Sequence, residues 1–152
     1  MECGTLNIVG IAGLLAGQKW IEKEGMENLH NKEMKFWDKL RKGLQEIDKV
    51  KMYCADSIEN HNAVLSFNIE GWDAGNVGTM LDVDHNIACR TGLQCAPLVH
   101  RQLGTEKIHG TVRLSIGAFN TEEHIDAAIE AVKNISSFER RSVNKKDKVE
   151  GV

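Results

Sequence analysis

The segment Arg90–Pro97 reads RTGLQCAP and contains a residue type suited to covalent chemistry, a cysteine close to a glycine. Cys95 lies just before Pro97, and proline is typical of the first turn of a helix. The positive end of a helix dipole favours the thiolate, the nucleophilic form of cysteine, and Arg90 adds positive charge nearby. The segment therefore predicts a nucleophilic Cys95, and the alternative is an inert thiol at the surface or half-buried.

A second candidate for chemistry is Arg113. Apolar and polar side chains alternate over Thr111–Ile116, which is typical of a strand with one buried face. Arg113 lies on the polar face together with Thr111 and Ser115. A guanidinium in that position can bind a carboxylate through two parallel hydrogen bonds. The alternatives are a structural ion pair and a solvated strand face.

The other cysteines and the histidines predict structural roles. The four cysteines, at positions 3, 54, 89 and 95, form no CxxC pair and no cluster with zinc-ligand spacing. Cys54 and Cys89 lie in apolar strand patterns, which assigns them to the core, and Cys3 carries no interpretable signal. The six histidines lack the i, i+4 spacing of a metal site. We therefore expect surface or hydrogen-bonding histidines and no bound metal.

Composition excludes several classes of protein. The chain has 152 residues, of which 19 are basic, 22 are acidic and 41% are hydrophobic. These values predict one folded domain rather than a disordered chain. Residues 138–152 hold five Lys or Arg and three Asp or Glu, so residues 1–137 have a net charge of −5. A negative domain does not attract a phosphate backbone, which argues against a nucleic-acid partner. Neither a phosphate loop nor a dinucleotide-binding motif is present.

The apolar segment Ile8–Gly17 is similar to the core of a signal peptide, but Met1 and Glu2 supply no positive charge before it. The segment is also too short to span a bilayer. Unpaired cysteines are typical of a reducing compartment. We therefore expect a soluble, cytoplasmic protein with no membrane partner.

Two helices are predicted at the N-terminal end. The first covers about 6–24, and Gly10, Gly13 and Gly17 line one of its faces, which allows another backbone or a ligand to approach closely. Tight packing within the protein explains this face equally well. A second helix follows Gly25, with an apolar stripe formed by Trp37, Leu40, Leu44 and Ile47.

The remaining chain alternates between short strands and helices. Strand patterns cover 50–54, 63–69, 87–92 and 111–116. Helices are expected after an N-cap at Asp73, from Pro97 to Leu103, and after a capping box of Asn120 and Glu123. The predicted fold class is α+β, a small and mostly antiparallel sheet of three to four strands covered by helices on one side.

Several of these segments together resemble a known family. The motifs are ECGTLN at 2–7, RTGLQCAPL at 90–98, GTVRLS at 110–115 and FNTEE at 119–123. In this order they resemble the C-terminal part of cysteine desulfurases of the class V aminotransferase group, which are pyridoxal-phosphate enzymes of fold type I. The resemblance extends from about Glu2 to Ser136.

The resemblance implies a role for each matching residue. Cys95 is expected to be the nucleophile that takes sulfur from L-cysteine and holds it as a persulfide, with L-alanine released. Arg113 is expected to bind the α-carboxylate of the substrate. Arg90 is expected at the base of a mobile cysteine loop, near the substrate. Thr5, after Gly4, is expected to reach the cofactor phosphate of the other subunit in a homodimer.

The chain also departs from the family, because no lysine lies in a motif that matches the family's cofactor lysine. We therefore expect residues 1–137 to be the C-terminal small domain with its connecting helix, and residues 138–152 to be a disordered tail. Pyridoxal phosphate belongs to the complete enzyme, and we expect this fragment to be inactive and to bind none. A sulfur-acceptor protein is the expected partner of the complete enzyme.

Two alternatives stay open. The parent enzyme is either a desulfurase or a class V aminotransferase or lyase that does not use Cys95. Alternatively, the chain is a non-catalytic thiol or scaffold domain.

Overall fold

The computed structural model describes residues 4–54 and 61–138. Cys3 and almost all of the predicted tail, 139–152, lie outside the described residues. The elements, in chain order, are α1 (Ile8–Glu24), α2 (Met26–Gln45), β1 (Val50–Tyr53), β2 (Val64–Ile69), α3 (Ala74–His85), β3 (Arg90–Gly92), α4 (Pro97–Leu103), the 3₁₀ turn η2 (Glu106–Ile108), β4 (Thr111–Ser115) and α5 (Glu122–Ser137).

The described strands form one antiparallel sheet with the order β1-β2-β4-β3. Its register aligns the apolar sets of the two central strands, because Leu65 lies opposite Leu114 and Phe67 lies opposite Val112. Directly opposed residues of antiparallel strands point to the same face, so these side chains form one apolar layer. The predicted α+β class with a small antiparallel sheet is confirmed.

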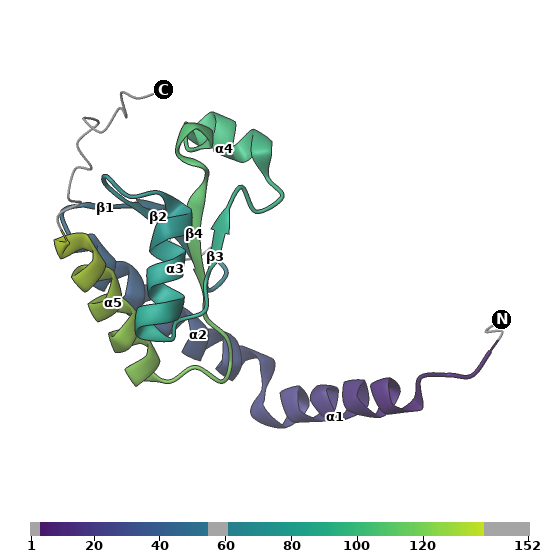
Figure 1. The fold of residues 1–152 in the computed structure, drawn as a ribbon. Coiled ribbons are helices and arrows are strands. Elements are labelled where there is room, and N and C mark those ends of the chain that lie inside the picture. Colours follow the sequence, from purple (N-terminus) through teal and green to yellow (C-terminus); the bar gives the residue numbers. More distant parts are fainter. Residues whose placement is uncertain (1–3, 55–60, 139–152) are drawn as a thin grey trace, which may run out of the picture.

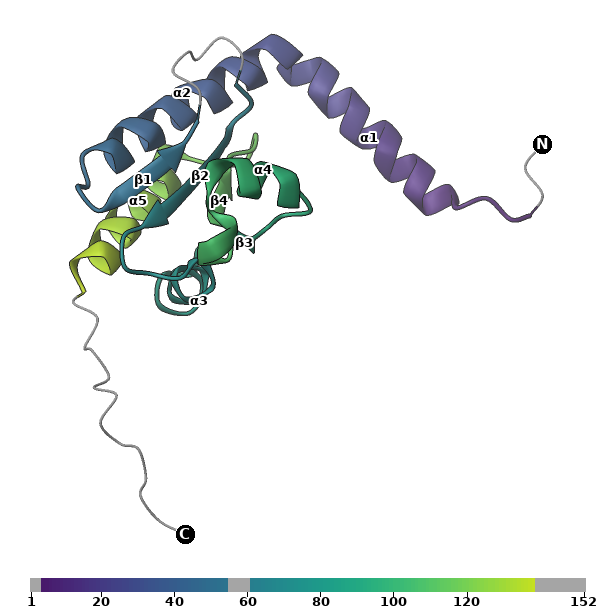
Figure 2. The same cartoon turned by 90° about the horizontal axis from the view of Figure 1, so that it is seen from above.

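Helices α2, α3 and α5 cover the apolar face of this sheet (Figures 1 and 2). The apolar stripe of α2 is buried at Trp37, Leu40 and Leu44, and the Trp37 indole Nε1 donates a hydrogen bond to the Val64 carbonyl oxygen at 3.0 Å. Burial of these large side chains supplies most of the stabilisation expected for a sheet covered on one side. Helix α2 therefore packs against β1 and β2 on the face opposite the site described below.

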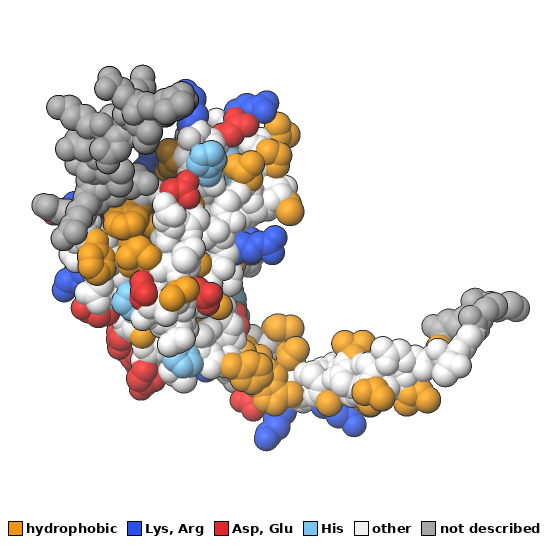
Figure 3. Space-filling view, viewed as in Figure 1, with side chains coloured by type: hydrophobic (Ala, Val, Ile, Leu, Met, Phe, Trp, Pro, Cys, Tyr) orange, Lys and Arg blue, Asp and Glu red, His pale blue; other side chains and the backbone are white. Residues whose placement is uncertain are grey.

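Helix α1 differs from the other long helices because none of its residues is buried. It extends away from the sheet, and hydrophobic side chains lie exposed along it (Figure 3). Ile8, Val9 and Leu14 are 72%, 84% and 75% exposed. No described helix is long and apolar enough to cross a membrane. The predicted helix at about 6–24 is present, but its apolar side chains pack against almost nothing in this chain.

Three predicted details are wrong at element ends. The N-cap of α5 is Thr121, whose backbone N–H donates to His124 Nδ1 at 3.3 Å, rather than Asn120 with Glu123. Asn120 Oδ1 instead accepts a hydrogen bond from the Gly117 backbone N–H at 2.8 Å, which closes the preceding turn. The strand expected over 87–92 is confined to Arg90–Gly92, because only these residues pair with β4. Ile47 lies beyond the end of α2.

Candidate active site

The face of the sheet opposite α2 and α5 carries the polar side chains. Tyr53 of β1 pairs with Ser66 of β2, Ser66 pairs with Arg113 of β4, and Arg113 pairs with Arg90 of β3. One row of side chains therefore crosses all strands of the sheet on its polar face. The predicted separation of Arg113 from the apolar face of its strand is confirmed by the burial of Val112 and Leu114.

A pocket of about 230 Å³ lies on this face, between the strands and α4. Tyr53, Ser66, Thr111 and Arg113 come from the strands, while the other lining residues come from α4 and the loop before it: Gln94, Ala96, Val99, His100 and Leu103. The lining contains no Asp or Glu. The short helix α4 thus lies over the face that the other helices leave open, although we expected helices on one side only.

Arg113 supplies positive charge to this pocket. Among the residues that the structure describes, its guanidinium has no ion-pair or hydrogen-bond partner, and its Nε is fully buried. A buried guanidinium nitrogen without an acceptor is costly, whereas a carboxylate accepts hydrogen bonds in the fork geometry that arginine offers. The pocket is therefore suited to an anionic ligand, and the predicted alternative of an ion pair within the chain finds no support among these residues.

Arg90 reinforces the positive charge. It lies directly opposite Arg113 across the β3–β4 pair and is exposed. Like charges directly opposite each other destabilise a sheet, and an anion bound between or beside them relieves that repulsion. Arg90 is not part of the pocket lining, so its contribution to the pocket is electrostatic.

Two hydroxyl groups add hydrogen-bonding capacity to the pocket. Burial raises the pKa of Tyr53, so the phenol stays protonated and can act as a hydrogen-bond donor over the physiological pH range. Thr111 Oγ1 is buried and has no partner within the described part of the chain. Together with Arg113, these groups can bind the polar end of a small molecule.

Cys95 lies in the loop between β3 and α4, at the edge of this pocket. Its neighbours Gln94 and Ala96 line the pocket, whereas Cys95 itself is exposed and is not part of this lining. The backbone N–H of Ala96 donates to the Leu93 carbonyl oxygen at 2.9 Å, which closes a turn with Gln94 and Cys95 at its centre. Both central residues have positive φ, 51° and 61°. Left-handed backbone costs non-glycine residues about 1–2 kcal/mol each.

The glycine of the GTVR motif, Gly110, lies against Gly92, the last residue of β3 before the Cys95 loop. Gly110 has a φ of 96°, and any Cβ at this position would overlap the backbone of Gly92. Gly92 itself has a φ of 94° and pairs with Thr111. Glycine is favoured at both positions by the positive φ, and at Gly110 also because the Gly92 backbone leaves no room for a side chain. This close approach brings the Cys95 loop next to the strand that carries Arg113.

His100 is the buried polar residue of α4 and also lines the pocket. Its Nδ1 lies 2.7 Å from Thr105 Oγ1, and the Thr105 backbone N–H donates to the His100 carbonyl oxygen at 2.9 Å. His100 is therefore a hydrogen-bonding histidine, as predicted, and its contacts with Thr105 lie at the C-terminal end of α4. They stabilise the C-terminal end of the helix that lies over the polar face.

The other predicted site residues, Gly4 and Thr5, do not join this pocket. Both are exposed in the segment before α1, at the end of that helix farthest from the sheet (Figures 1 and 2). A single chain therefore does not bring Thr5 together with Cys95 and Arg113. The expected role of Thr5 at the cofactor phosphate of another subunit stays a prediction.

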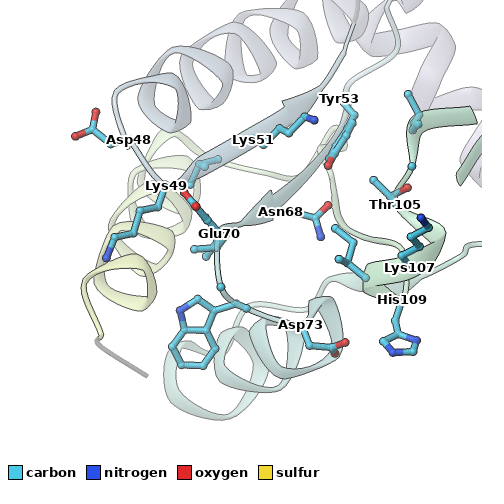
Figure 4. Close-up of a pocket in the computed structure, with 17 residues that line it drawn as sticks. Asp48, Lys49, Lys51, Tyr53, Asn68, Glu70, Asp73, Thr105, Lys107 and His109 are labelled. Atoms are coloured by element: carbon cyan, nitrogen blue, oxygen red, sulfur yellow. The ribbon is translucent and has the colours of Figure 1, made fainter. Parts of the chain in front are cut away.

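A larger pocket, of about 760 Å³, lies beside the first on the same face of the sheet, where Lys51, Tyr53 and Asn68 face Thr105 and Lys107 (Figure 4). Lysines and acidic residues both line it, and it contains neither Cys95 nor Arg113. Its mixed charge contrasts with the positive pocket beneath the Cys95 loop. We therefore assign the candidate active site to the smaller pocket.

The remaining described cysteines have structural surroundings. Cys54 and Cys89 are half-buried and pack against the hydrophobic core, as predicted. Burial raises the pKa of the Cys89 thiol, and the negative charge of Asp82 raises it further. Within the described ranges, no group of His, Cys, Asp and Glu could hold a metal ion.

Sequence reasoning did not find Tyr53, Ser66, Gln94 and His100 as pocket residues. Tyr53 and Ser66 lie on the polar faces of their strands, but their position next to Arg113 depends on strand order and register. His100 shows no distinctive spacing, so only its burial beneath α4 reveals it. Thr111 was predicted on the same face as Arg113, and the structure agrees.

Comparison with known families gives one match that covers most of the chain. Residues 1–128 match the family model "Aminotransferase class-V". A probable cysteine desulfurase of Pyrococcus abyssi is 36% identical over 140 residues, which are 90% of this chain and 34% of that protein. A second, of Methanothermobacter thermautotrophicus, is 33% identical over 137 residues, 90% of this chain and 34% of that protein.

Solved structures give a similar result. A cysteine desulfurase of Thermococcus onnurineus NA1 in its apo form has a TM-score of 0.81 and 35% identity, over 89% of this chain and 32% of that one. A cysteine desulfurase of Escherichia coli has a TM-score of 0.74 and 26% identity, over 88% of this chain and 32% of that one. The chain therefore spans about a third of the length of the relatives it matches.

Proposed function

The chain belongs to the aminotransferase class-V family, and we propose that it forms the small-domain part of a pyridoxal-phosphate-dependent cysteine desulfurase. In this proposal residues 1–137 are that domain, α1 is the connecting helix, and 138–152 form a tail. Cys95 accepts sulfur from L-cysteine, and Arg113 binds the substrate carboxylate. The names of the relatives and the pocket chemistry both support this function.

The observation that carries the proposal is the guanidinium of Arg113, which has no partner among the described residues and lies in a pocket bordered by the Cys95 loop. L-Cysteine carries its carboxylate and its thiol on adjacent carbons. A molecule held by its carboxylate at Arg113 therefore has its sulfur within a few ångströms of that anchor. Gln94 and Ala96 on either side of Cys95 line the same pocket as Arg113, so movement of the exposed thiol toward the pocket brings the two sulfurs together.

The chemistry assigned to Cys95 is nucleophilic sulfur transfer. The Cys95 thiolate attacks the substrate sulfur, a sulfur–sulfur bond forms, and the bond between that sulfur and the substrate β-carbon breaks. The electron pair of the broken bond stays with the carbon framework, which takes up a proton and leaves as L-alanine. The products are L-alanine and a Cys95 persulfide, with no external oxidant or reductant.

Pyridoxal phosphate is the cofactor of this family, and it supplies an electron sink for the substrate carbons. The described residues do not form a complete site for it. Gly4 and Thr5 are exposed, and a Cβ placed at Gly4 would meet no described atom within 4 Å, so none of the described residues encloses a phosphate there. We propose that Thr5 and Gly4 complete the cofactor site of a second subunit in a homodimer.

The cellular setting is part of the same proposal. Cys54, Cys89 and Cys95 are free thiols, which supports a reducing compartment, the cytoplasm. An exposed Cys95 suits transfer of the persulfide sulfur to a thiol of a separate sulfur-acceptor protein. We assign no nucleic-acid or membrane partner to the chain.

A chimera tests the function. The part of the Thermococcus onnurineus desulfurase that lies outside the matched region is joined to this chain, and cofactor absorbance, alanine release and Cys95 persulfide are measured. We expect L-cysteine-dependent alanine and a persulfide on Cys95. Cys95→Ser should retain the cofactor and lose sulfur transfer, and Cys54→Ser is the matched control. Arg113→Lys should lower kcat/KM by about tenfold to a hundredfold through loss of bidentate binding, while Arg101→Lys should not.

The same chimera separates the alternatives. Unchanged sulfur release in Cys95→Ser would contradict the desulfurase assignment and favour a lyase that does not use the thiol. A chimera that binds cofactor without turning over L-cysteine would favour a non-catalytic thiol or scaffold domain.

A further inference from the structure

The turn that presents Cys95 adopts an uncommon conformation. Gln94 and Cys95 occupy its two central positions, and both have positive φ, as in a type I′ turn. Glycine, asparagine and aspartate dominate such positions because other side chains meet steric resistance there. The residues at this turn are instead glutamine and cysteine. A left-handed pair of this kind persists only where surrounding contacts stabilise it.

The side chain of Gln94 makes contacts that can hold this turn. Its Nε2 lies 3.3 Å from the Arg90 carbonyl oxygen and 3.2 Å from the Thr111 carbonyl oxygen. An amide NH₂ group has two hydrogens, so it can donate to both carbonyls at once. One acceptor lies on β3 before the turn and the other on β4, next to Arg113. The side chain therefore ties the tip of the turn to both strands beneath it.

We propose that Gln94 is a positioning residue for Cys95. Its amide anchors the Cys95 turn to the strand that carries Arg113, and so keeps the thiol exposed at the edge of the pocket. The thiol's role in sulfur transfer rests on the proposed function, whereas the anchoring is a property of this chain alone. Loss of the amide donors leaves the left-handed backbone unsupported, and the turn then opens.

A simple packing role for Gln94 predicts a different outcome from an anchoring role. Gln94→Met keeps the length and most of the volume of the side chain but removes both donors. Gln94→Gly removes the whole side chain but also removes the steric cost of positive φ. If the volume of the Gln94 side chain is what holds the turn, the methionine variant keeps the turn conformation and the glycine variant loses it. If it matters as an anchor against backbone strain, glycine preserves the turn better than methionine does.

The experiment uses the 152-residue chain and hydrogen exchange by NMR, because the Ala96 N–H closes the turn. In Gln94→Met we expect the Ala96 protection factor to fall by about tenfold, the loss of one to two net hydrogen bonds. The strong intraresidue amide–Hα NOE of Cys95, typical of positive φ, should weaken in parallel. Gln94→Gly should keep both signals close to those of the parent chain. Protection at Val112 and the melting temperature should not change in either variant.

Unchanged Ala96 protection in Gln94→Met would overturn the anchoring role, and so would a glycine variant more disturbed than the methionine variant. Gln102→Met, on the exposed surface of α4, is the matched control for the substitution. None of these outcomes depends on sulfur transfer. The anchor can therefore fail while the desulfurase assignment stands, and the reverse also holds.

Discussion

The described cysteines of this chain differ in surroundings although their side chains are identical. Cys95 is exposed at the tip of a strained turn, while Cys89 is half-buried between α3 and β3. Burial and the nearby charge of Asp82 both disfavour the Cys89 thiolate. Because the thiolate is the reactive form, Cys89 is expected to react slowly, whereas the exposure of Cys95 makes that thiol accessible to reagents.

Alkylation with iodoacetamide tests this difference. At pH 8 we expect peptide mass spectrometry to find Cys95 modified at least about tenfold faster than Cys89, and both modified at similar rates in urea.

The raised pKa of Cys89 has a second consequence. The protonated thiol is favoured in the folded state, so its contribution to stability is complete below the ordinary pKa of 9.0 and is lost as the pH rises through the higher folded value. For the alkylation experiment, faster modification of Cys89 than of Cys95 in the folded chain would contradict the expected order of reactivity.

At the scale of elements, the fold depends on close contact between α2 and α5. Gly43 of α2 faces Ile129 of α5, and a Cβ at position 43 would lie 2.8 Å from Ile129 Cγ1. Lys39 also joins the two helices, with its Nζ 2.9 Å from Glu122 Oε1 and 2.6 Å from Asp126 Oδ1. These carboxylates raise the pKa of Lys39, Asp126 more than Glu122, but the groups are exposed and are screened by solvent. Packing at Gly43 therefore matters more than the ion pairs.

A matched pair of glycine substitutions tests this packing. Gly43→Ala should lower the free energy of unfolding by about 1–2 kcal/mol, because overpacking outweighs the gain of about 1 kcal/mol in helix propensity. Gly17→Ala on α1 meets no atom within 4 Å, so only the propensity gain is expected, visible as greater helicity by circular dichroism. Urea unfolding followed by tryptophan fluorescence gives the first quantity. Equal effects of the two substitutions would argue against close packing at Gly43.

At the scale of the whole molecule, α1 stands apart from the domain. It buries none of its residues, whereas α2 buries Phe36, Trp37, Leu40 and Leu44. The Trp20 ring at its C-terminal part stacks on Phe119, with ring centroids 5.0 Å apart. A helix without buried apolar contacts has little stability beyond its own hydrogen bonds. Under the proposed function α1 is the connecting helix, and its exposed apolar side chains are available for packing against the rest of the enzyme.

Hydrogen exchange by mass spectrometry tests the independence of α1. In the isolated chain we expect peptides of α1 to exchange at least about a hundredfold faster than those of α2, because local opening of α1 exposes little apolar surface. In the chimera, α1 should become protected. Strong protection of α1 in the isolated chain that increases with protein concentration would indicate self-association instead.

Local patterns in the sequence were sufficient for much of the fold. The spacing of Trp37, Leu40 and Leu44 predicted the buried stripe of α2, and the alternation over Thr111–Ile116 predicted which face Arg113 takes, because side-chain periodicity is a property of one helix or strand alone. The start of α5 was predicted wrongly, since Asn120 and Thr121 are both good N-cap residues in sequence. The turn at Gly117, a contact outside the helix, uses Asn120 and leaves Thr121 as the cap.

Sequence patterns alone were thus sufficient for the element types, the candidate residues Cys95 and Arg113, and the family that their motifs resemble. The folded chain adds that Tyr53 and Ser66 lie in one row with Arg113, that α4 with His100 covers that row, and that Thr5 lies apart from it. Periodicity is set by neighbours in sequence, whereas strand order, register and the position of α4 are set by burial and hydrogen bonds between segments far apart in the chain.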